Sequence, residues 1–485
     1  MRRFDSGARL SERGGVSHGA LSLIERIESV ALALRRHLPD GCAVGLLADN
    51  SPDWAIADLA LQEGGFLTIP IPGFFSAEQR RLLIESRGVG AILAPIEAAA
   101  LLPPEFHYFK GQSGSSLALF SRGKGAAQDA SARGAKLTFT SGSTGSPKGI
   151  LLTAEQQWRT ALSLAASLRP MNIRRHLALL PMSVLLENVA GLYTALSLGA
   201  EVILPWLADV GLSGSSTFDA RKAISAIRET ESESAIVLPQ MLRAMTTELR
   251  ASGERMRSLK FLAVGGGKVA PSLIEEARRV GLPVYEGYGL SEACSVVSLN
   301  LPGQDRPGSV GKPLAHHAVE IANDGEIRVR DVAAWRIADD ASAWTDSGDI
   351  GRFDADGFLH VTGRKKNVLI TGFGRNVSPE WPEAALLAHP EVLQVMVYGE
   401  GQQRLSALIV PCDPCADGAR LQAVVDRANE TLPDYARIGD WHPIKQPFSV
   451  EDGTLTSNGR LKRDGIAARH TSLIYSNSSS GVING

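Results

Sequence analysis

The spacing of apolar residues is the feature that most constrains how this chain can fold. From residue 21, segments with an apolar residue every three or four positions alternate with short, continuously apolar runs. The former are typical of amphipathic helices and the latter of buried strands. The series opens with SLIERIESVALALRRHL, CAVGLLA, DWAIADLALQEGG and FLTIPI, and it continues to about residue 310. Strands that alternate with helices build parallel sheets covered by helices, so we expect an α/β domain.

Two smaller units follow in the sequence. Beyond residue 310, short strand-like runs separated by glycine turns predict a small β-rich section. From about residue 366, a helix, two strands and a further helix predict a small, mobile α+β domain. We therefore expect a large domain over 1–365 and a small domain over 366–470. The final residues 471–485, which include SNSSSGVING, have the composition of a disordered tail.

Composition excludes several classes of protein. The 50 Lys and Arg residues nearly balance 52 Asp and Glu residues, so no overall basic field attracts nucleic acid or an anionic membrane. Four cysteines in 485 residues do not make a disulfide framework, and no apolar run reaches the roughly 20 residues that span a bilayer. The polar N-terminus lacks the apolar core of a signal peptide, which favours a cytoplasmic location. Cys412 and Cys415 form CDPC, but without a second such pair we favour unpaired loop cysteines over a zinc or redox site.

The segment LTFTSGSTGSPKGI, residues 137–150, joins an apolar strand to a polar loop. Glycines permit close backbone approach, and hydroxyls, amides and a lysine suit phosphate oxygens. The Walker A pattern is absent because Lys148 is followed by Gly149. We predict a polyphosphate-binding loop, rather than a flexible Ser/Gly linker, formed by Thr140, Ser141, Gly142, Ser143, Thr144, Gly145 and Lys148.

This loop resembles the signature loop of the adenylate-forming superfamily, which includes acyl-CoA synthetases, peptide-synthetase adenylation domains and luciferases. The chain is closest in character to the fatty acyl or aryl acid–CoA ligases, and further motifs follow in the family's order between Asp49 and Arg463. YEGYGLSE, residues 285–292, is similar to the family's adenine and metal motif. The resemblance implies that Tyr288 stacks on adenine and that Ser291 contacts the α-phosphate.

Other roles come from the same resemblance. In this motif it places Gly289 at the nucleotide and Glu292 on the Mg²⁺ that bridges the ATP phosphates, with Thr140 as a further metal contact. Carboxylate oxygen is a suitable ligand for Mg²⁺. VGGGKV, residues 264–269, resembles the loop between the adenine and the acyl pocket, which includes Gly266 and Gly267.

TDSGDIGRFDADGFLHVTGRKKN, residues 345–367, resembles the family's ribose-binding and hinge region. By that likeness Asp349 accepts hydrogen bonds from the ribose hydroxyls, Arg364 also reaches the ribose, and Lys366 is the hinge between the two domains. An ionised carboxylate only accepts hydrogen bonds, so it complements a diol that donates them.

The chain departs from the family near its C-terminus. LTSNGRLKR, residues 455–463, aligns with the segment that carries the adenylation lysine, but Arg460 stands at that position and Lys462 lies two places further on. Arginine keeps the charge but presents a planar fork in place of a compact ammonium group. Either Arg460 or Lys462 could therefore take this catalytic role.

The resemblance implies ATP- and Mg²⁺-dependent activation of a small-molecule carboxylic acid. The acyl group then passes to the thiol of CoA or of the phosphopantetheine on an acyl or peptidyl carrier protein. Val184, Leu185 and Leu186 stand where relatives place substrate-contacting residues, which favours a fatty or aromatic acid. Two alternatives remain at this stage: capture of the adenylate by a non-thiol nucleophile, and a nucleotide-binding protein with impaired adenylation.

Overall fold

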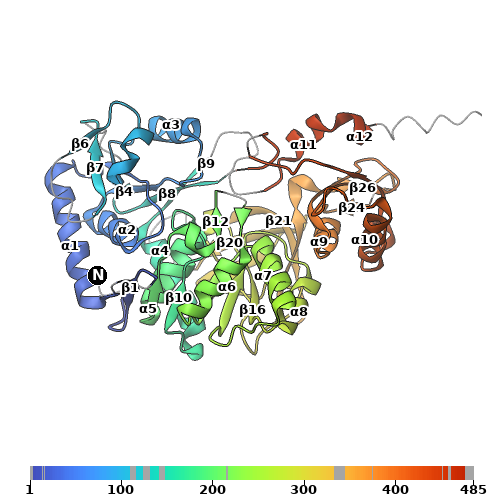
Figure 1. The fold of residues 1–485 in the computed structure, drawn as a ribbon, viewed down its shortest axis with the longest axis horizontal. Helices are drawn as coiled ribbons and strands as arrows, with labels where there is room; N and C mark the ends of the chain where they lie inside the picture. Colours follow the sequence, from blue (N-terminus) through green and yellow to red (C-terminus); the bar gives the residue numbers. More distant parts are fainter. Residues whose placement is uncertain are drawn as a thin grey trace, which may run out of the picture.

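The protein forms three lobes in a computed structural model (Figure 1). The structure describes residues 4–13, 15, 17–109, 116–123, 132–140, 148–214, 217–332, 344–373, 375–450, 452–456 and 460–475. Two lobes, blue and green in Figure 1, each contain a large sheet, and the orange and red lobe is formed by the C-terminal part of the chain.

The first lobe is built on a seven-stranded sheet. Its central strands run parallel because helices connect them, whereas three outer strands, β6, β7 and β9, pair in an antiparallel way. In spatial order the strands are β6 His107–Phe109, β7 Ala118–Ser121, β5 Ala91–Ala94, β3 Ala43–Leu46, β4 Leu67–Pro70, β8 Lys136–Thr140 and β9 Lys148–Leu152.

The second lobe is built on a nine-stranded sheet. Six neighbouring strands run parallel, and antiparallel strands extend both edges. In spatial order the strands are β18 Lys312–Pro313, β17 Ser298–Leu299, β16 Val284–Tyr288, β15 Phe261–Val264, β14 Ser234–Val237, β10 Arg175–Leu177, β11 Glu201–Ile203, β1 Arg9–Ser11 and β2 Ser17–Gly19.

Helices fill the space between the two sheets and cover their outer faces. One apolar cluster joins both sheets to the inner helices α1 Ala20–His37, α2 Pro52–Gly64, α4 Ala154–Leu168 and α5 Thr194–Leu198. A second cluster packs α6 Ala220–Glu229, α7 Pro239–Ser252 and α8 Pro271–Arg279 on the outer face of the nine-stranded sheet, and α3 Ala77–Ser86 covers the other sheet. Burial of these apolar faces is the main force that holds the layers together.

A β-rich section and the third lobe complete the chain. The section is a four-stranded antiparallel sheet of β19 His317–Ile321, β20 Glu326–Asp331, β21 Thr345–Phe353 and β22 Leu359–Arg364. The 3₁₀ turn η8 Lys365–Asn367 then leads to the third lobe. Its main elements are α9 Glu380–Leu387, β25 Val392–Tyr398, β26 Leu405–Pro411, α10 Gly418–Glu430, β27 Ile438–Pro443, α11 Arg463–Arg469 and α12 Thr471–Tyr475. Short hairpins are formed by β12 Leu212–Ser213 with β13 Thr217–Phe218 and by β23 Leu369–Ile370 with β24 Asn376–Val377.

The structure confirms the predicted α/β class and differs from the sequence-based expectations in two places. Residues 186–193, within a segment read only as part of an apolar pocket, form a π-helix, η4. Helix α12 occupies the first five residues of the expected tail, because Ile474 packs into the apolar cluster of the third lobe. The remaining tail residues, 476–485, lie outside the described part of the chain. No helix in the described ranges combines the length and apolar character that crossing a bilayer requires.

Candidate functional site

The predicted phosphate loop connects two paired strands of the first lobe. β8 and β9 are antiparallel neighbours, and Thr140 stands opposite Lys148 in their register. Residues 141–147, which include Ser141, Gly142, Ser143, Thr144 and Gly145, lie outside the described residues, as do the side chains of Thr140 and Lys148. The phosphate and metal contacts of this loop therefore stay predictions.

A buried ionic cluster holds the strand that leads into this loop. Lys136 Nζ lies 2.9 Å from a carboxylate oxygen of Asp58 on α2 and also contacts the side-chain oxygen of Asn188. Tyr193 donates a hydrogen bond of 2.8 Å to Asp58. Desolvation by burial lowers the pKa of Lys136, and the charge of Asp58 raises it. Sequence reasoning missed this cluster, although an acidic residue inside the apolar pattern of α2 was a visible signal.

The Asp349 carboxylate forms a hydrogen bond with one side chain and an ion pair with another at the edge of the second lobe. Tyr288, the last residue of β16, donates a hydrogen bond of 2.7 Å from its hydroxyl to Asp349 Oδ2. Arg364 Nε lies 2.8 Å from Asp349 Oδ1, because the two residues are paired across β21 and β22. Burial raises the pKa of Asp349, whereas Arg364 and the Tyr288 hydroxyl lower it. The structure thus brings together three residues to which the family resemblance assigned roles in binding adenosine.

The turn after β16 carries the predicted metal and α-phosphate residues. Ser291 and Glu292 lie in the 3₁₀ turn η6 Ser291–Ala293, and both line a cavity between the lobes. Gly289 allows the turn to close, because a Cβ atom there would lie only 1.5 Å from the carbonyl oxygen of Ser295. Glu292 is exposed, and its carboxylate makes no hydrogen bond to another described residue.

The donor set at Glu292 fits Mg²⁺. The described residues contain no group of three or more His, Cys, Asp or Glu side chains that could enclose a metal ion. Mg²⁺ commonly uses one or two carboxylates and fills its remaining positions with water and substrate phosphate. A single free carboxylate is therefore compatible with a Mg²⁺ ion that arrives with its nucleotide.

The glycine turn after β15 forms another part of the cavity wall. Gly266 has a φ of +81°, a backbone conformation that side-chain-bearing residues rarely adopt. At Gly267 a Cβ atom would lie 3.4 Å from Pro239, in ordinary contact. The turn therefore depends on glycine most strongly at residue 266, where the backbone borders the cavity.

The third lobe supplies Arg460 to the same cavity. The backbone amide of Arg460 donates to Thr456 Oγ1 at 3.0 Å, and the carbonyl of Arg460 accepts from the Thr456 amide at 2.7 Å. Arg460 Nη2 reaches the Gly266 carbonyl oxygen at 3.4 Å. Arg460 as a whole is exposed, but the protein around its guanidinium displaces water, and this desolvation lowers the pKa of the guanidinium. Arg364 lowers this pKa further, and Asp349 and Glu292 raise it.

Two other predicted residues lie away from the cavity. Lys462 is exposed, precedes α11 as its N-cap residue and does not line the cavity. Lys366 is exposed within η8, directly after the β-rich section. Its position at the junction of the β-rich section and the third lobe suits the predicted hinge.

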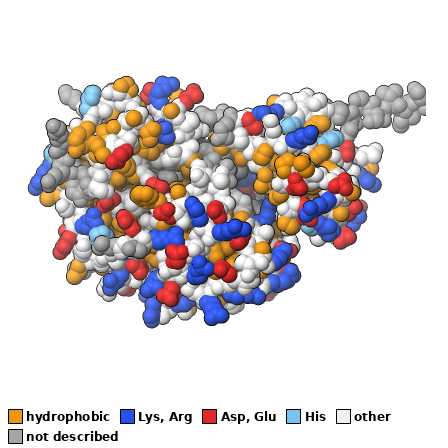
Figure 2. Space-filling view, viewed as in Figure 1, with side chains coloured by type: hydrophobic (Ala, Val, Ile, Leu, Met, Phe, Trp, Pro, Cys, Tyr) orange, Lys and Arg blue, Asp and Glu red, His pale blue; other side chains and the backbone are white. Residues whose placement is uncertain are grey.

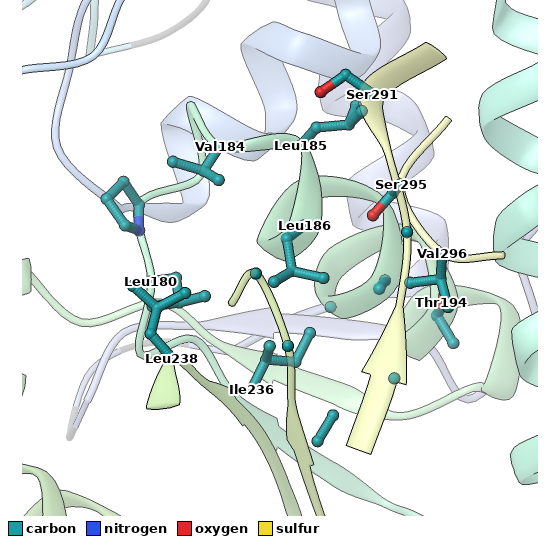
Figure 3. Close-up of a pocket in the computed structure, with 18 of the residues that line it drawn as sticks. Leu180, Val184, Leu185, Leu186, Thr194, Ile236, Leu238, Ser291, Ser295 and Val296 are labelled. Carbon is teal, nitrogen blue, oxygen red and sulfur yellow. The ribbon is translucent and has the colours of Figure 1, made fainter. Parts of the chain in front are cut away.

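A cavity of about 380 Å³ extends from these polar residues into the second lobe. Val184, Leu185 and Leu186 line it, as the sequence predicted (Figure 3). Deeper walls come from α4 and from strands β15 and β17, and they are mainly apolar. Leu198 at the end of α5 and Ile173, which precedes β10, also line the cavity, with Leu164, Leu168, Phe261 and Leu299 from α4, β15 and β17.

A buried polar pair completes this wall. His176 Nε2 lies 2.9 Å from Glu187 Oε1, and its Nδ1 lies 3.0 Å from Ser234 Oγ. Glu187 also accepts a hydrogen bond from the Leu180 amide at 3.0 Å. These contacts fix the start of η4 against the sheet, so they shape the pocket.

The fold and the site therefore define a large α/β enzyme whose small C-terminal lobe contributes the cation of Arg460 to a cavity with polar residues at one end and apolar walls. Residues 21–332 match the family described as AMP-binding enzyme, and residues 366–477 match the AMP-binding enzyme C-terminal domain. The chain belongs to the AMP-binding enzyme family.

Several known proteins are similar to this chain. A 2-succinylbenzoate–CoA ligase from Bacillus licheniformis is 32% identical over 55% of this chain, and the match spans 56% of that relative. The long-chain-fatty-acid–CoA ligase FadD15 from Mycobacterium bovis is 26% identical over 90% of this chain and 87% of its own length. The crystal structure of the anthranilate CoA ligase AuaEII with anthranoyl-AMP has a TM-score of 0.77 at 20% identity, covering 95% of this chain and 93% of that one.

Proposed function

We propose that this protein activates a fatty or aromatic carboxylic acid with ATP, forming an acyl-adenylate and pyrophosphate, and then transfers the acyl group to the thiol of CoA. The observation that carries the proposal is the convergence of Tyr288, Asp349 and Arg460 at the mouth of a deep apolar cavity. One end of the site suits adenosine and phosphate, and the other suits a hydrocarbon body.

The residues of the site divide the work between binding and charge neutralisation. Asp349 would accept hydrogen bonds from the ribose hydroxyls, with Arg364 holding its carboxylate in place, and Tyr288 would stack on adenine. Mg²⁺ bound by Glu292 would supply charge compensation for the phosphates. Arg460 would bridge the carboxylate and the α-phosphate, because a guanidinium binds such oxygens in pairs.

This division suits the chemistry of the first half-reaction. The carboxylate oxygen forms a bond to the α-phosphorus as the bond from that phosphorus to pyrophosphate breaks. Both reactants are anions, so positioning and electrostatic stabilisation lower the barrier, and no side-chain nucleophile is required. The apolar cavity would hold the acid's body and keep water from the mixed anhydride.

The second half-reaction requires the thiol to reach the acyl carbon. We propose that the third lobe turns about Lys366 and withdraws Arg460, which opens the path to the adenylate. A rotation of one domain about a few residues is a hinge motion. Two of the similar proteins, 2-succinylbenzoate–CoA ligase and FadD15, are CoA ligases, which supports CoA as the acceptor. A carrier-protein phosphopantetheine presents the same thiol and is the second acceptor to test.

Pyrophosphate release from a panel of fatty and aromatic acids with Mg-ATP tests the first half-reaction. We expect release with at least one acid, and an acyl-CoA product detected by mass when CoA is added. The absence of pyrophosphate release with every acid would contradict adenylation. Release without any thioester, on CoA or on a phosphopantetheinylated carrier protein, would contradict the thiol acceptor and favour another nucleophile.

A further inference from the structure

Ser295 lies in the wall of the apolar cavity without a hydrogen-bond partner. The residue is 8% exposed, and its hydroxyl oxygen makes no hydrogen bond to any described residue. Among the described residues that line the cavity, Ser295 alone has a buried polar side-chain atom that makes no hydrogen bond. A buried hydroxyl without a partner is unfavourable, so native proteins seldom keep one unless a bound molecule satisfies it.

Three other hydroxyls of the same wall, those of Thr194, Ser234 and Ser347, are already satisfied within the protein. Thr194 donates to the Val189 carbonyl at 2.9 Å, and Ser234 pairs with His176 at 3.0 Å. Ser347 donates to the Ile327 carbonyl at 2.6 Å. Of these four hydroxyls, only that of Ser295 remains available to a ligand.

The backbone holds Ser295 in an unusual conformation that directs it to the cavity. Its φ is +90°, and that of Cys294 is +57°, in the region that favours glycine. The amide of Ser295 donates to the Leu290 carbonyl at 3.1 Å, and its own carbonyl packs on Gly289. The turn that carries Glu292 thus also presents the hydroxyl of Ser295.

The position of Ser295 indicates which part of a substrate it would meet. Figure 3 shows Ser295 between Ser291 and Val296, with its oxygen directed into the pocket on the side of Leu186. Ser291 lines the cavity and is the residue predicted to contact the α-phosphate, whereas Leu299, further along the chain, belongs to the apolar part of the wall. A ligand group at Ser295 therefore lies close to the carboxyl end of the acid.

We infer that Ser295 is a specificity-determining residue: the preferred acid carries a hydroxyl, keto or amino group near its carboxyl group and is otherwise apolar. This inference rests on the proposed function. A serine hydroxyl both donates and accepts hydrogen bonds, so it can pair with any of these three groups. An acid without such a group would leave the Ser295 hydroxyl without a hydrogen bond. The enzyme should therefore bind and activate that acid less well.

The test compares acids that differ in one substituent: salicylate and anthranilate with benzoate, and 3-hydroxydecanoate with decanoate. We expect the wild-type enzyme to prefer the substituted acid in at least one pair by about ten- to a hundredfold in kcat/KM for pyrophosphate release. Ser295→Ala should reduce that preference to about threefold or less, because the single hydroxyl that distinguishes the acids is gone.

Ser298→Ala is the matched control. Its hydroxyl is also fully buried but donates to the Val310 carbonyl at 2.9 Å, outside the cavity wall. This variant should lose stability and keep the wild-type preference. Ser295→Gly provides a second route if the alanine variant folds poorly. Glycine tolerates the positive φ, so this variant should melt at a higher temperature than Ser295→Ala and also lose the preference.

Three results would overturn the inference while leaving the proposed function intact. They are a preference for the unsubstituted acid in every pair, an unchanged preference in Ser295→Ala and Ser295→Gly, and an equal loss of preference in Ser298→Ala. Failure of the whole acid panel to release pyrophosphate would instead contradict the proposed function itself.

Discussion

Arg460 provides the sharpest test of how the acid is adenylated, because the sequence offered Lys462 as a second candidate. We expect Arg460→Ala to lose most acyl-adenylate formation and Lys462→Ala to stay within about twofold of the wild type. Only Arg460 lines the cavity and reaches the Gly266 carbonyl. The side chain of Lys462 is exposed at the start of α11.

The size of the loss follows from the position of the guanidinium. A positive charge about 4 Å from a phosphate charge contributes on the order of 4 kcal/mol at an effective dielectric constant of about 20. Each ~1.4 kcal/mol changes a rate tenfold, so complete removal corresponds to nearly 10³-fold. The cavity mouth is open, and water would replace part of the interaction. We therefore expect a loss of about 10²- to 10³-fold for Arg460→Ala and a smaller loss for Arg460→Lys, which keeps the charge.

Exchange of pyrophosphate into ATP measures the first half-reaction, and thioester formation from supplied acyl-adenylate measures the second. Arg460→Ala should impair the exchange and leave the second reaction largely intact, since the proposed hinge motion withdraws Arg460 before the thiol attacks. A large loss in Lys462→Ala with near-normal exchange in Arg460→Ala would refute this assignment. Normal exchange in both variants would mean that the large domain performs adenylation alone.

Three other outcomes are expected. Glu292→Ala should reduce Mg²⁺-dependent pyrophosphate release by about 10²-fold or more, and near-normal release would contradict its metal role. Lys136→Met should lower the free energy of unfolding by roughly 3–5 kcal/mol in urea titrations, because it leaves the buried Asp58 carboxylate without a cation. The partly exposed pair of Lys260 with Glu233 should contribute less than ~1 kcal/mol. Burial raises the pKa of Glu286 to about 8, so the folded protein holds a proton that the unfolded chain has lost above about pH 4.5. Stability should therefore fall as the pH rises from about 5 to 8, by up to roughly 1.4 kcal/mol per pH unit, and Glu286→Gln should remove that part of the slope; equal slopes in both proteins would contradict the shift.

Regular elements were largely predictable, because their signals lie within short stretches of sequence. The helix at Ala20–His37 and the strand at Ala43–Leu46 follow the predicted periodicities, and the third lobe contains its expected helices and strands. The π-helix at Leu186–Tyr193 was not predictable in this way. Its apolar residues resemble any buried segment, and the contacts of Glu187 and Asn188 with distant residues hold its shape.

Charged side chains of both signs are mixed on the face of the molecule that Figure 2 shows. This mixture is what the near-zero net charge led us to expect.

The sequence by itself determined the fold class, the order of the motifs and the residue types that suit a nucleotide, because turn chemistry and hydrophobic periodicity are local properties. Only the tertiary structure decided which of those residues meet. Tyr288 and Asp349 are 61 positions apart, and Arg460 is 194 positions from Gly266. The choice of Arg460 over Lys462 as the residue at the cavity, and the unpaired hydroxyl of Ser295, also became visible only there. Such contacts depend on how sheets, helices and lobes pack against one another, and no short stretch of sequence records that packing.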